Sequence, residues 1–114
     1  MEDCLFCKIA AGEIPSDKVF EDDQLIAFKD INPSAPVHIL LIPREHIVSL
    51  NEVDASHLEL LGHMQIVAAQ VAKKMEIDKA GYRLVNNNGY QGGQEIPHLH
   101  YHLLGGRTMN WPPG

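Results

Sequence analysis

The sequence predicts an α+β fold, in which a five-stranded antiparallel sheet carries one long helix and a short N-terminal helix. Five short apolar or alternating segments are joined mostly by short connections, which is typical of antiparallel neighbours. Only residues 56–75 have the length and apolar spacing of a long helix. The 114 residues contain no repeat or linker, so we expect one domain over residues 1–114.

The N-terminal third of the chain is expected to supply the short helix and three strands. An amphipathic helix over residues 5–11 precedes Gly12, which stands at the C′ position where glycine commonly ends a helix. Residues 19–21 and 25–29 follow as strands separated by a turn, and the apolar residues 37–42 form the third strand.

The long helix is expected over residues 56–75. Ser56 followed by Glu59 matches a capping box, and Lys73 and Lys74 suit the negative end of the helix dipole. The apolar positions of this helix cover more than the one narrow stripe that packing against a sheet requires. This width favours a second partner surface, and we expect a homodimer.

The last two strands are expected over residues 82–86 and 98–104, with a glycine-containing loop between them. His98, His100 and His102 occupy alternate positions of the final strand. Alternate side chains of a strand share one face, so neighbouring imidazoles would lie roughly 6.5–7 Å apart. Imidazoles act near neutral pH as metal ligands, nucleophiles or proton carriers. The spacing alone leaves zinc binding and nucleophilic catalysis at phosphorus equally open.

Two further motifs indicate a ligand. Gly92-Gly93-Gln94 lies upstream of the histidines, and glycines let backbone N–H groups approach a phosphate closely. Cys4 and Cys7 form a Cys-x-x-Cys pair, which in an intracellular chain is typical of metal-binding or redox-active cysteines.

Composition argues against several classes of function. A net charge of −6 at pH 7 argues against broad binding of nucleic acid or anionic membranes, because both require basic patches. No apolar run approaches the roughly 20 residues that span a bilayer, and the start of the sequence lacks the features of a signal peptide. We therefore expect a cytoplasmic protein that binds neither nucleic acid nor membranes.

The run from His98, His-Leu-His-Tyr-His-Leu-Leu, resembles the signature of the histidine triad (HIT) family of nucleotide-binding proteins. Similar motifs extend along nearly the whole chain, among them Cys4-Leu-Phe-Cys-Lys-Ile, Gly12-Glu-Ile-Pro-Ser, Ala35-Pro-Val-His and Gly92-Gly-Gln. The closing Trp111-Pro-Pro-Gly is similar to the Hint branch, the nucleoside phosphoramidate hydrolases, more than to the dinucleoside polyphosphate hydrolases. The resemblance implies a HIT-like fold.

The resemblance also implies catalytic roles. His100 corresponds to the nucleophile that attacks the α-phosphorus and forms a nucleotidyl-histidine, while its second ring nitrogen donates to a carbonyl or another histidine. His102 corresponds to a residue that hydrogen-bonds the phosphate, and His38 is a further member of the imidazole cluster. Glu95 stands where animal members of this branch have a serine that assists the departing amine. A carboxyl group would replace that serine as a donor only in its protonated form.

A pocket for a purine nucleotide is implied as well. Asp30 corresponds to the residue that accepts from the ribose hydroxyls, and Asn87 and Gly93 match positions that contact phosphate or ribose. Gln94 belongs to the same glycine-rich cradle. The base would be enclosed by four apolar side chains, Phe6, Ile9, Phe28 and Ile31.

Zinc is the expected cofactor. Cys4, Cys7, His46 and His98 would supply the four ligands of a closed tetrahedral site, and family members with this Cys-x-x-Cys are similar to ones that bind zinc. We expect a structural zinc that pins the N-terminal helix to the sheet and leaves His100 free for catalysis. The alternative is a pair of buried thiols one helical turn apart.

The resulting hypothesis is a homodimeric hydrolase that cleaves purine nucleoside phosphoramidates to a nucleoside monophosphate, with no metal in the chemistry. Three alternatives stay open. They are a nucleotide-binding regulatory protein with incidental activity, a dinucleoside polyphosphate hydrolase, and a zinc enzyme that uses the triad as ligands.

Overall fold

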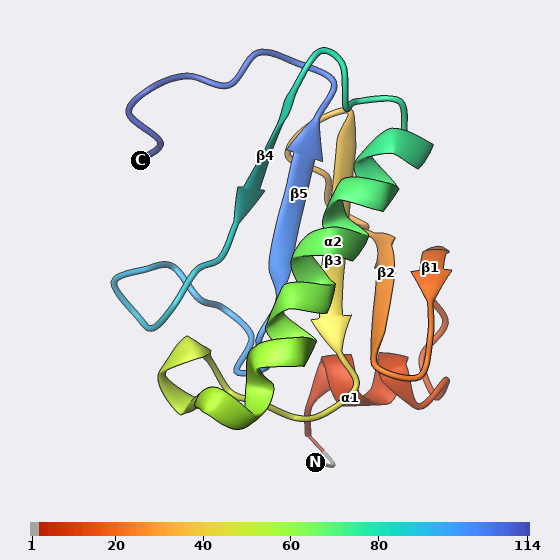
Figure 1. Ribbon diagram of the computed structural model, residues 1–114, viewed down its shortest axis with the longest axis vertical. Helices are drawn as coiled ribbons and strands as arrows, with labels where there is room; N and C mark the ends of the chain where they lie inside the picture. Colours follow the sequence, from red (N-terminus) through yellow and green to blue (C-terminus); the bar gives the residue numbers. More distant parts are fainter. Residues whose placement is uncertain (1–2) are drawn as a thin grey trace.

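The computed structural model describes residues 3–114, and its five strands form one antiparallel sheet in the order β1-β2-β3-β5-β4. The predicted α+β class is therefore confirmed. In Figure 1, β1 and β4 lie at the two edges of the sheet and β3 lies between β2 and β5. The strands are Lys18–Glu21 (β1), Leu25–Lys29 (β2), Val37–Pro43 (β3), Tyr82–Val85 (β4) and Tyr101–Gly105 (β5).

Two helices cover opposite faces of this sheet. Helix α2, Leu58–Lys74, crosses one face, whereas the short helix α1, Leu5–Ala10, lies at one end of the other face (Figure 1). Gly12 follows α1 with φ +78°, as predicted for a C′ glycine. Neither helix of residues 3–114 is long and apolar enough to cross a membrane.

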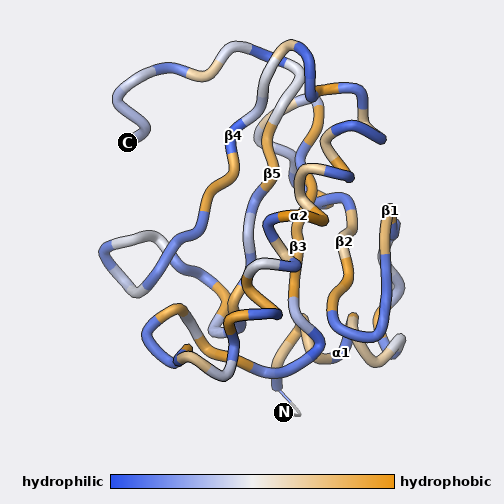
Figure 2. The backbone as a smooth tube through the Cα atoms, viewed as in Figure 1, coloured by the Kyte–Doolittle hydropathy of each residue, from blue (hydrophilic) through white to orange (hydrophobic). Residues whose placement is uncertain are grey.

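Strand β2 shows how the two faces are filled. Its side chains alternate, so Leu25 and Ala27 join the apolar cluster under α2, and Ile26 and Phe28 join the cluster under α1. The strand is buried on both faces for this reason, and its sequence is continuously apolar from Leu25 to Phe28. Figure 2 shows apolar residues concentrated along the central strands, while the turns between elements are mainly hydrophilic.

The start of α2 differs from the prediction. A 3-10 turn, Ala55–His57, precedes the helix, and the capping box joins Asp54 and His57 rather than Ser56 and Glu59. The Asp54 carboxylate accepts from the Ser56 backbone N–H at 2.9 Å, and the Asp54 N–H donates to the His57 ring at 3.1 Å. The Ser56 hydroxyl also donates to this carboxylate, and Ser56 lies inside the 3-10 turn rather than at its cap.

The start of β5 is the second difference. The strand begins at Tyr101, so the prediction that the ladder already includes His98 and His100 is wrong. Residues 96–98 form a bend, in which the His98 N–H donates to the Ile96 carbonyl at 2.8 Å. The Leu99 N–H then donates to the Ile47 carbonyl at 2.6 Å. The residue between His98 and His100 is thus bonded to the segment that follows β3, and the Asn86 side chain donates to the His100 carbonyl at 3.0 Å.

Candidate active site and metal centre

A cavity of about 480 Å³ lies beside the sheet, on the face that carries α1. Every predicted catalytic or nucleotide-binding residue except Gln94 lines it: Phe6, Ile9, Phe28, Asp30, Ile31, His38, Asn87, Gly93, Glu95, His100 and His102. Nine further residues also line the cavity: Leu5, Ile14, Pro15, Ser16, Lys29, Asn32, Ser34, Leu40 and Ile96. The structure thus collects residues from two distant parts of the chain, 5–40 and 87–102, around one space.

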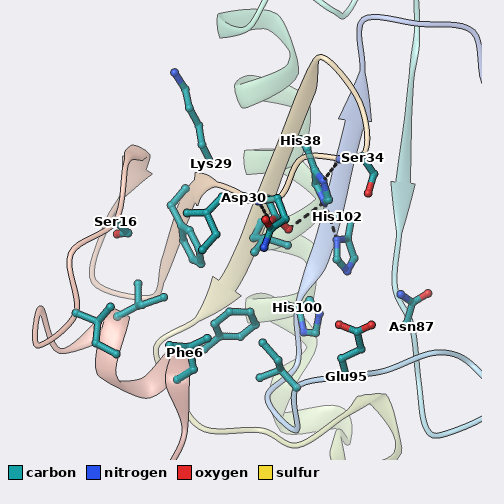
Figure 3. A pocket seen from close by; sticks show the side chains of 18 of the residues that line it. Phe6, Ser16, Lys29, Asp30, Ser34, His38, Asn87, Glu95, His100 and His102 are labelled. Carbon is teal, nitrogen blue, oxygen red and sulfur yellow. Dashed lines mark hydrogen bonds and ion pairs between the residues drawn. The ribbon is translucent and has the colours of Figure 1, made fainter.

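The walls of the cavity differ in polarity. Figure 3 shows His38, His102 and His100 following one another along β3 and the β5 segment, with Glu95 beside His100 and Asn87 farther away, beyond Glu95. Phe6 lies at the α1 end, where its ring packs edge to face on His100 at 5.0 Å and on Phe28 at 5.9 Å between centroids. One part of the cavity is therefore apolar and aromatic, whereas another is rich in hydrogen-bonding groups.

The His100 ring has one nitrogen fixed by the backbone. Its Nδ1 lies 2.7 Å from the His98 carbonyl oxygen, which can only accept a hydrogen bond. Nδ1 therefore carries the proton of the neutral ring, and Nε2 keeps its lone pair. His100 is buried and lines the cavity, so this lone pair is held on a group whose orientation is constrained.

His38 and His102 form a second, linked arrangement. The Ser34 backbone N–H donates to His38 Nδ1 at 3.0 Å, so the neutral His38 ring carries its proton on Nε2. His38 Nε2 lies 2.9 Å from His102 Nδ1 and donates to it. The proton of neutral His102 then sits on its Nε2. The backbone of Ser34 thereby makes His102 a hydrogen-bond donor toward a ligand in the cavity.

Both rings favour the neutral state. Burial lowers the pKa of His38, and the Asp30 carboxylate 3.5 Å from its Nε2 offsets only part of that effect. Burial, together with the neighbouring His100 and His38, lowers the pKa of His102 to about 4. Near neutral pH, His102 is therefore an uncharged donor.

Asp30, His38 and His102 also lie close enough together to resemble a metal site. The tautomers argue against this reading. A metal ligand must offer a lone pair, but the Ser34 N–H occupies His38 Nδ1 and the ring proton occupies His38 Nε2. These three residues fit a hydrogen-bonded cluster better than a metal centre.

A separate cluster lies at the start of α1, where Cys4 and Cys7 meet His46 and His98. Their potential ligand atoms all lie within 4.8 Å of one another. Cys4 Sγ is 3.2 Å and Cys7 Sγ is 3.5 Å from His98 Nδ1, and Cys7 Sγ is 3.2 Å from His46 Nδ1. Neighbouring sulfur and nitrogen ligands of a tetrahedral zinc, with bonds of about 2.0–2.3 Å, lie at roughly this separation.

The orientation of His98 supports the same fit. His98 is fully buried, and its Nε2 donates to the Pro43 carbonyl at 2.8 Å. Its Nδ1 lone pair is thus directed to the two sulfurs, as in metal sites where a backbone carbonyl orients a ligating histidine. Burial raises the pKa of the Cys7 thiol, so occupation by a metal would displace a thiol proton. The donor set and its surroundings fit a closed zinc site.

The glycine-rich loop is arranged differently from the prediction in two respects. Gly93 lines the cavity, but its N–H donates to the Tyr90 carbonyl at 3.1 Å and is already paired. Gln94 does not line the cavity, because its side-chain amide bonds to the backbone of Gly89, Val48 and Ile96. The expected contacts of Gln94 and of the Gly93 amide with a nucleotide are thus not prepared in this conformation.

The carbonyl partner expected for the second ring nitrogen of His100 is present, but sequence reasoning missed the backbone partners of His98 and His38. The Ser34 amide and the carbonyls of Pro43 and His98 set three ring orientations, but every residue except proline offers the same two backbone groups. No residue-type signal marks these positions. The two prolines around Ser34, which place it in a bend before β3, are the only local indication.

The chain is similar in sequence to several known proteins. Residues 3–111 match the family model described as "Scavenger mRNA decapping enzyme C-term binding". A purine nucleoside phosphoramidase of Escherichia coli is 50% identical over 108 residues, covering 95% of this chain and 91% of that protein. A 14 kDa zinc-binding protein of Brassica juncea is 49% identical, covering 98% of this chain and 100% of that protein.

A solved structure has the same fold as this chain. The HIT family hydrolase from Legionella pneumophila superposes with a TM-score of 0.97 at 53% identity, covering 98% of this chain and 100% of that chain. A chain with this fold and an imidazole cluster in the cavity is a HIT-type protein. It belongs to the histidine triad family and, within that family, to the Hint-like branch.

Proposed function

We propose that this protein hydrolyses purine nucleoside phosphoramidates to a nucleoside monophosphate and an amine. The observation that carries the proposal is the Nδ1–H of His100 on the His98 carbonyl, which leaves Nε2 with a free lone pair inside the cavity. The activity named for the Escherichia coli relative supports the choice of a phosphoramidate as substrate.

In the first step, His100 Nε2 attacks the α-phosphorus, a P–N bond to Nε2 forms, and the P–N bond to the amine breaks. The electron pair of the broken bond leaves with the amine nitrogen, which takes up a proton. The Nε2–H of His102 donates to a phosphoryl oxygen and stabilises the charge that develops there. Asp30, which lines the same cavity, accepts from the ribose hydroxyls, and Phe6, Ile9, Phe28 and Ile31 enclose the base.

In the second step, water attacks phosphorus, the bond to His100 Nε2 breaks, and the nucleoside monophosphate is released. We assign the proton transfers to Glu95, whose carboxyl group lies beside His100 in Figure 3. It gives a proton to the departing amine and recovers one from the attacking water, so both residues return to their initial state.

We also propose that Cys4, Cys7, His46 and His98 hold a structural zinc. The Brassica juncea relative is named for zinc binding, and the four ligand atoms here have a spacing that suits that ion. Bound zinc would supply four bonds that fix α1 to the bend at His98. The phosphoryl transfer itself uses His100 and His102 and does not require the metal.

A homodimer forms the third part of the proposal. Leu58, Gly62 and Ile66 are spaced by four residues on one side of α2, and Leu58 and Ile66 are 71% and 60% exposed. Strand β4 ends the sheet on one side and has backbone groups available for a neighbour. A second copy of the chain would cover this apolar surface.

The test of the activity is turnover of adenosine 5′-phosphoramidate by the protein and by His100→Ala. We expect the variant to lose at least about 10³-fold in kcat, because the nucleophile is removed, while it still binds AMP. Hydrolysis of a dinucleoside polyphosphate is measured in parallel. Unchanged turnover in the variant, or a clear preference for the dinucleotide, would contradict the proposal.

A further inference from the structure

The side chain of Gln94 joins three separate backbone segments next to the cavity. Its Oε1 accepts from the Gly89 N–H at 3.0 Å, and its Nε2 donates to the Val48 carbonyl at 2.7 Å and the Ile96 carbonyl at 3.0 Å. Both Nε2 protons and the carbonyl oxygen of the amide are therefore in use. A side chain paired in this way serves the backbone around it rather than a ligand.

The first of these bonds closes the base of a loop. The Gln94 backbone N–H donates to the Gly89 carbonyl at 3.1 Å, so Gly89 and Gln94 are joined reciprocally. The loop packs tightly against the backbone just before this closure, since a Cβ on Gly92 would clash with the Asn88 carbonyl oxygen. The bond to Val48 then fixes this closed loop to the segment that follows β3.

The bond to Ile96 bears directly on Glu95. It connects the side chain of residue 94 to the carbonyl of residue 96, so the backbone on both sides of Glu95 is held. Glu95 has an exposed position, where a side chain on a free loop would sample many directions. In the structure its carboxylate lies beside His100 (Figure 3).

We propose that Gln94 is the positioning residue that holds Glu95 in place for proton transfer to the leaving group. This inference rests on the proposed function and names the residue on which its leaving-group step depends. A displacement of about 1 Å in such a group costs on the order of 10²-fold in rate. The loss should appear in kcat rather than in KM, because Gln94 does not line the cavity.

The experiment compares Gln94→Met with the unaltered protein on two AMP derivatives. One is an alkylamine phosphoramidate, whose nitrogen must be protonated to leave, and the other is the p-nitrophenyl ester, whose leaving group departs as an anion. We expect kcat to fall at least about 30-fold on the phosphoramidate and at least tenfold less on the ester. In the double variant with Glu95→Gln, the two losses should not multiply.

Gln91→Met is the matched control, because Gln91 lies exposed in the same loop and outside these three hydrogen bonds. It should keep the ratio of the two rates. Should Gln94→Met fold poorly, Gln94→Glu provides the same comparison, since its carboxylate still accepts from Gly89 but no longer donates to Val48 and Ile96. An equal loss on both substrates, a change in KM alone, or no loss would overturn the proposal.

Failure of the proposed function has a different signature. If the unaltered protein cleaves neither substrate, the proposed hydrolase function is wrong. The hydrogen bonds by which Gln94 holds the loop are then tested by amide hydrogen exchange. Gln94→Met should then speed exchange of the Gly89 N–H at least tenfold, and Gln91→Met should not. Unchanged protection of Gly89 would overturn the positioning role in either case.

Discussion

Backbone groups decide what each imidazole of this site does. The Pro43 carbonyl turns the Nδ1 of His98 toward the cysteine sulfurs, whereas the His98 carbonyl leaves the Nε2 of His100 with a lone pair. The Ser34 amide, acting through His38, gives His102 a donating Nε2–H. Three histidines at equal spacing thus have three different chemistries. The family resemblance predicted a carbonyl or histidine partner for His100, but the partners of His98 and His38 are backbone atoms that no residue type reveals.

The neutral state of His38 and His102 predicts a loss of stability in acid. Both pKa values are lowered in the folded state, that of His102 to about 4, while an unfolded histidine titrates near 6.5. Below pH 6.5 the unfolded chain binds more protons, so the free energy of unfolding falls as pH decreases toward 4. Each ring contributes a slope of up to about 1.4 kcal/mol per pH unit.

Urea unfolding between pH 7.5 and 4.5 measures this slope. His102→Asn is the comparison, because its amide oxygen can accept from His38 but the side chain does not titrate. Subtracting the pH dependence of the variant from that of the unaltered protein removes the contribution of the carboxylates, which both proteins share. We expect a shallower dependence in the variant. Equal slopes for the two proteins would show that His102 is not held neutral by the fold.

At the scale of elements, the N-terminal helix depends on the cluster at its start. Helix α1 has only six residues, fewer than an isolated helix needs to be stable in water. Phe6 and Ile9 bury its apolar side, and Cys4 and Cys7 join it to His46 and His98. The sequence predicted this helix and its glycine stop, because both signals are local. It misplaced the start of β5, where Leu99 bonds to a residue 52 positions earlier.

Zinc removal is therefore expected to loosen α1 first. Protein purified without added metal should contain about one zinc per chain, and chelation should lower Tm by about 10 °C while hydrogen exchange in residues 5–10 increases. Cys7→Ser should lose the metal. His63→Asn, which alters a histidine outside the cluster, should retain it. Zinc-free protein, or full zinc content in Cys7→Ser, would refute the metal site.

At the scale of the whole molecule, the cavity joins segments that are distant in sequence. Residues of α1, β2, β3, the glycine-rich loop and β5 all reach it, because the order β2-β3-β5 places those strands side by side. The local pattern of residue types predicted each strand, whereas the family resemblance predicted which residues of different strands line one cavity. Pattern alone did not indicate that the loop is closed by Gln94, since that closure depends on a bond to Val48.

The apolar side of α2 predicts that the chain associates with a second copy. Sedimentation equilibrium should give about twice the 12.7 kDa mass of one chain, and Ile66→Lys should reduce it toward the monomer because a charge enters the buried surface. Tyr90→Ser, which removes an exposed aromatic ring from the loop, should leave the dimer intact. A monomeric protein, or a dimer unaffected by Ile66→Lys, would contradict this association.

In the proposed reaction His100 Nε2 attacks phosphorus, and trapping the covalent intermediate shows whether it does. The protein is mixed with adenosine 5′-phosphoramidate, quenched within one turnover at alkaline pH, and digested for mass spectrometry. We predict an adenylyl group on the peptide that contains His100, assigned to that residue by fragmentation, and none in His100→Ala. An adduct on another residue would contradict attack by His100. So would consumption of the substrate with no adduct found in any quenched sample.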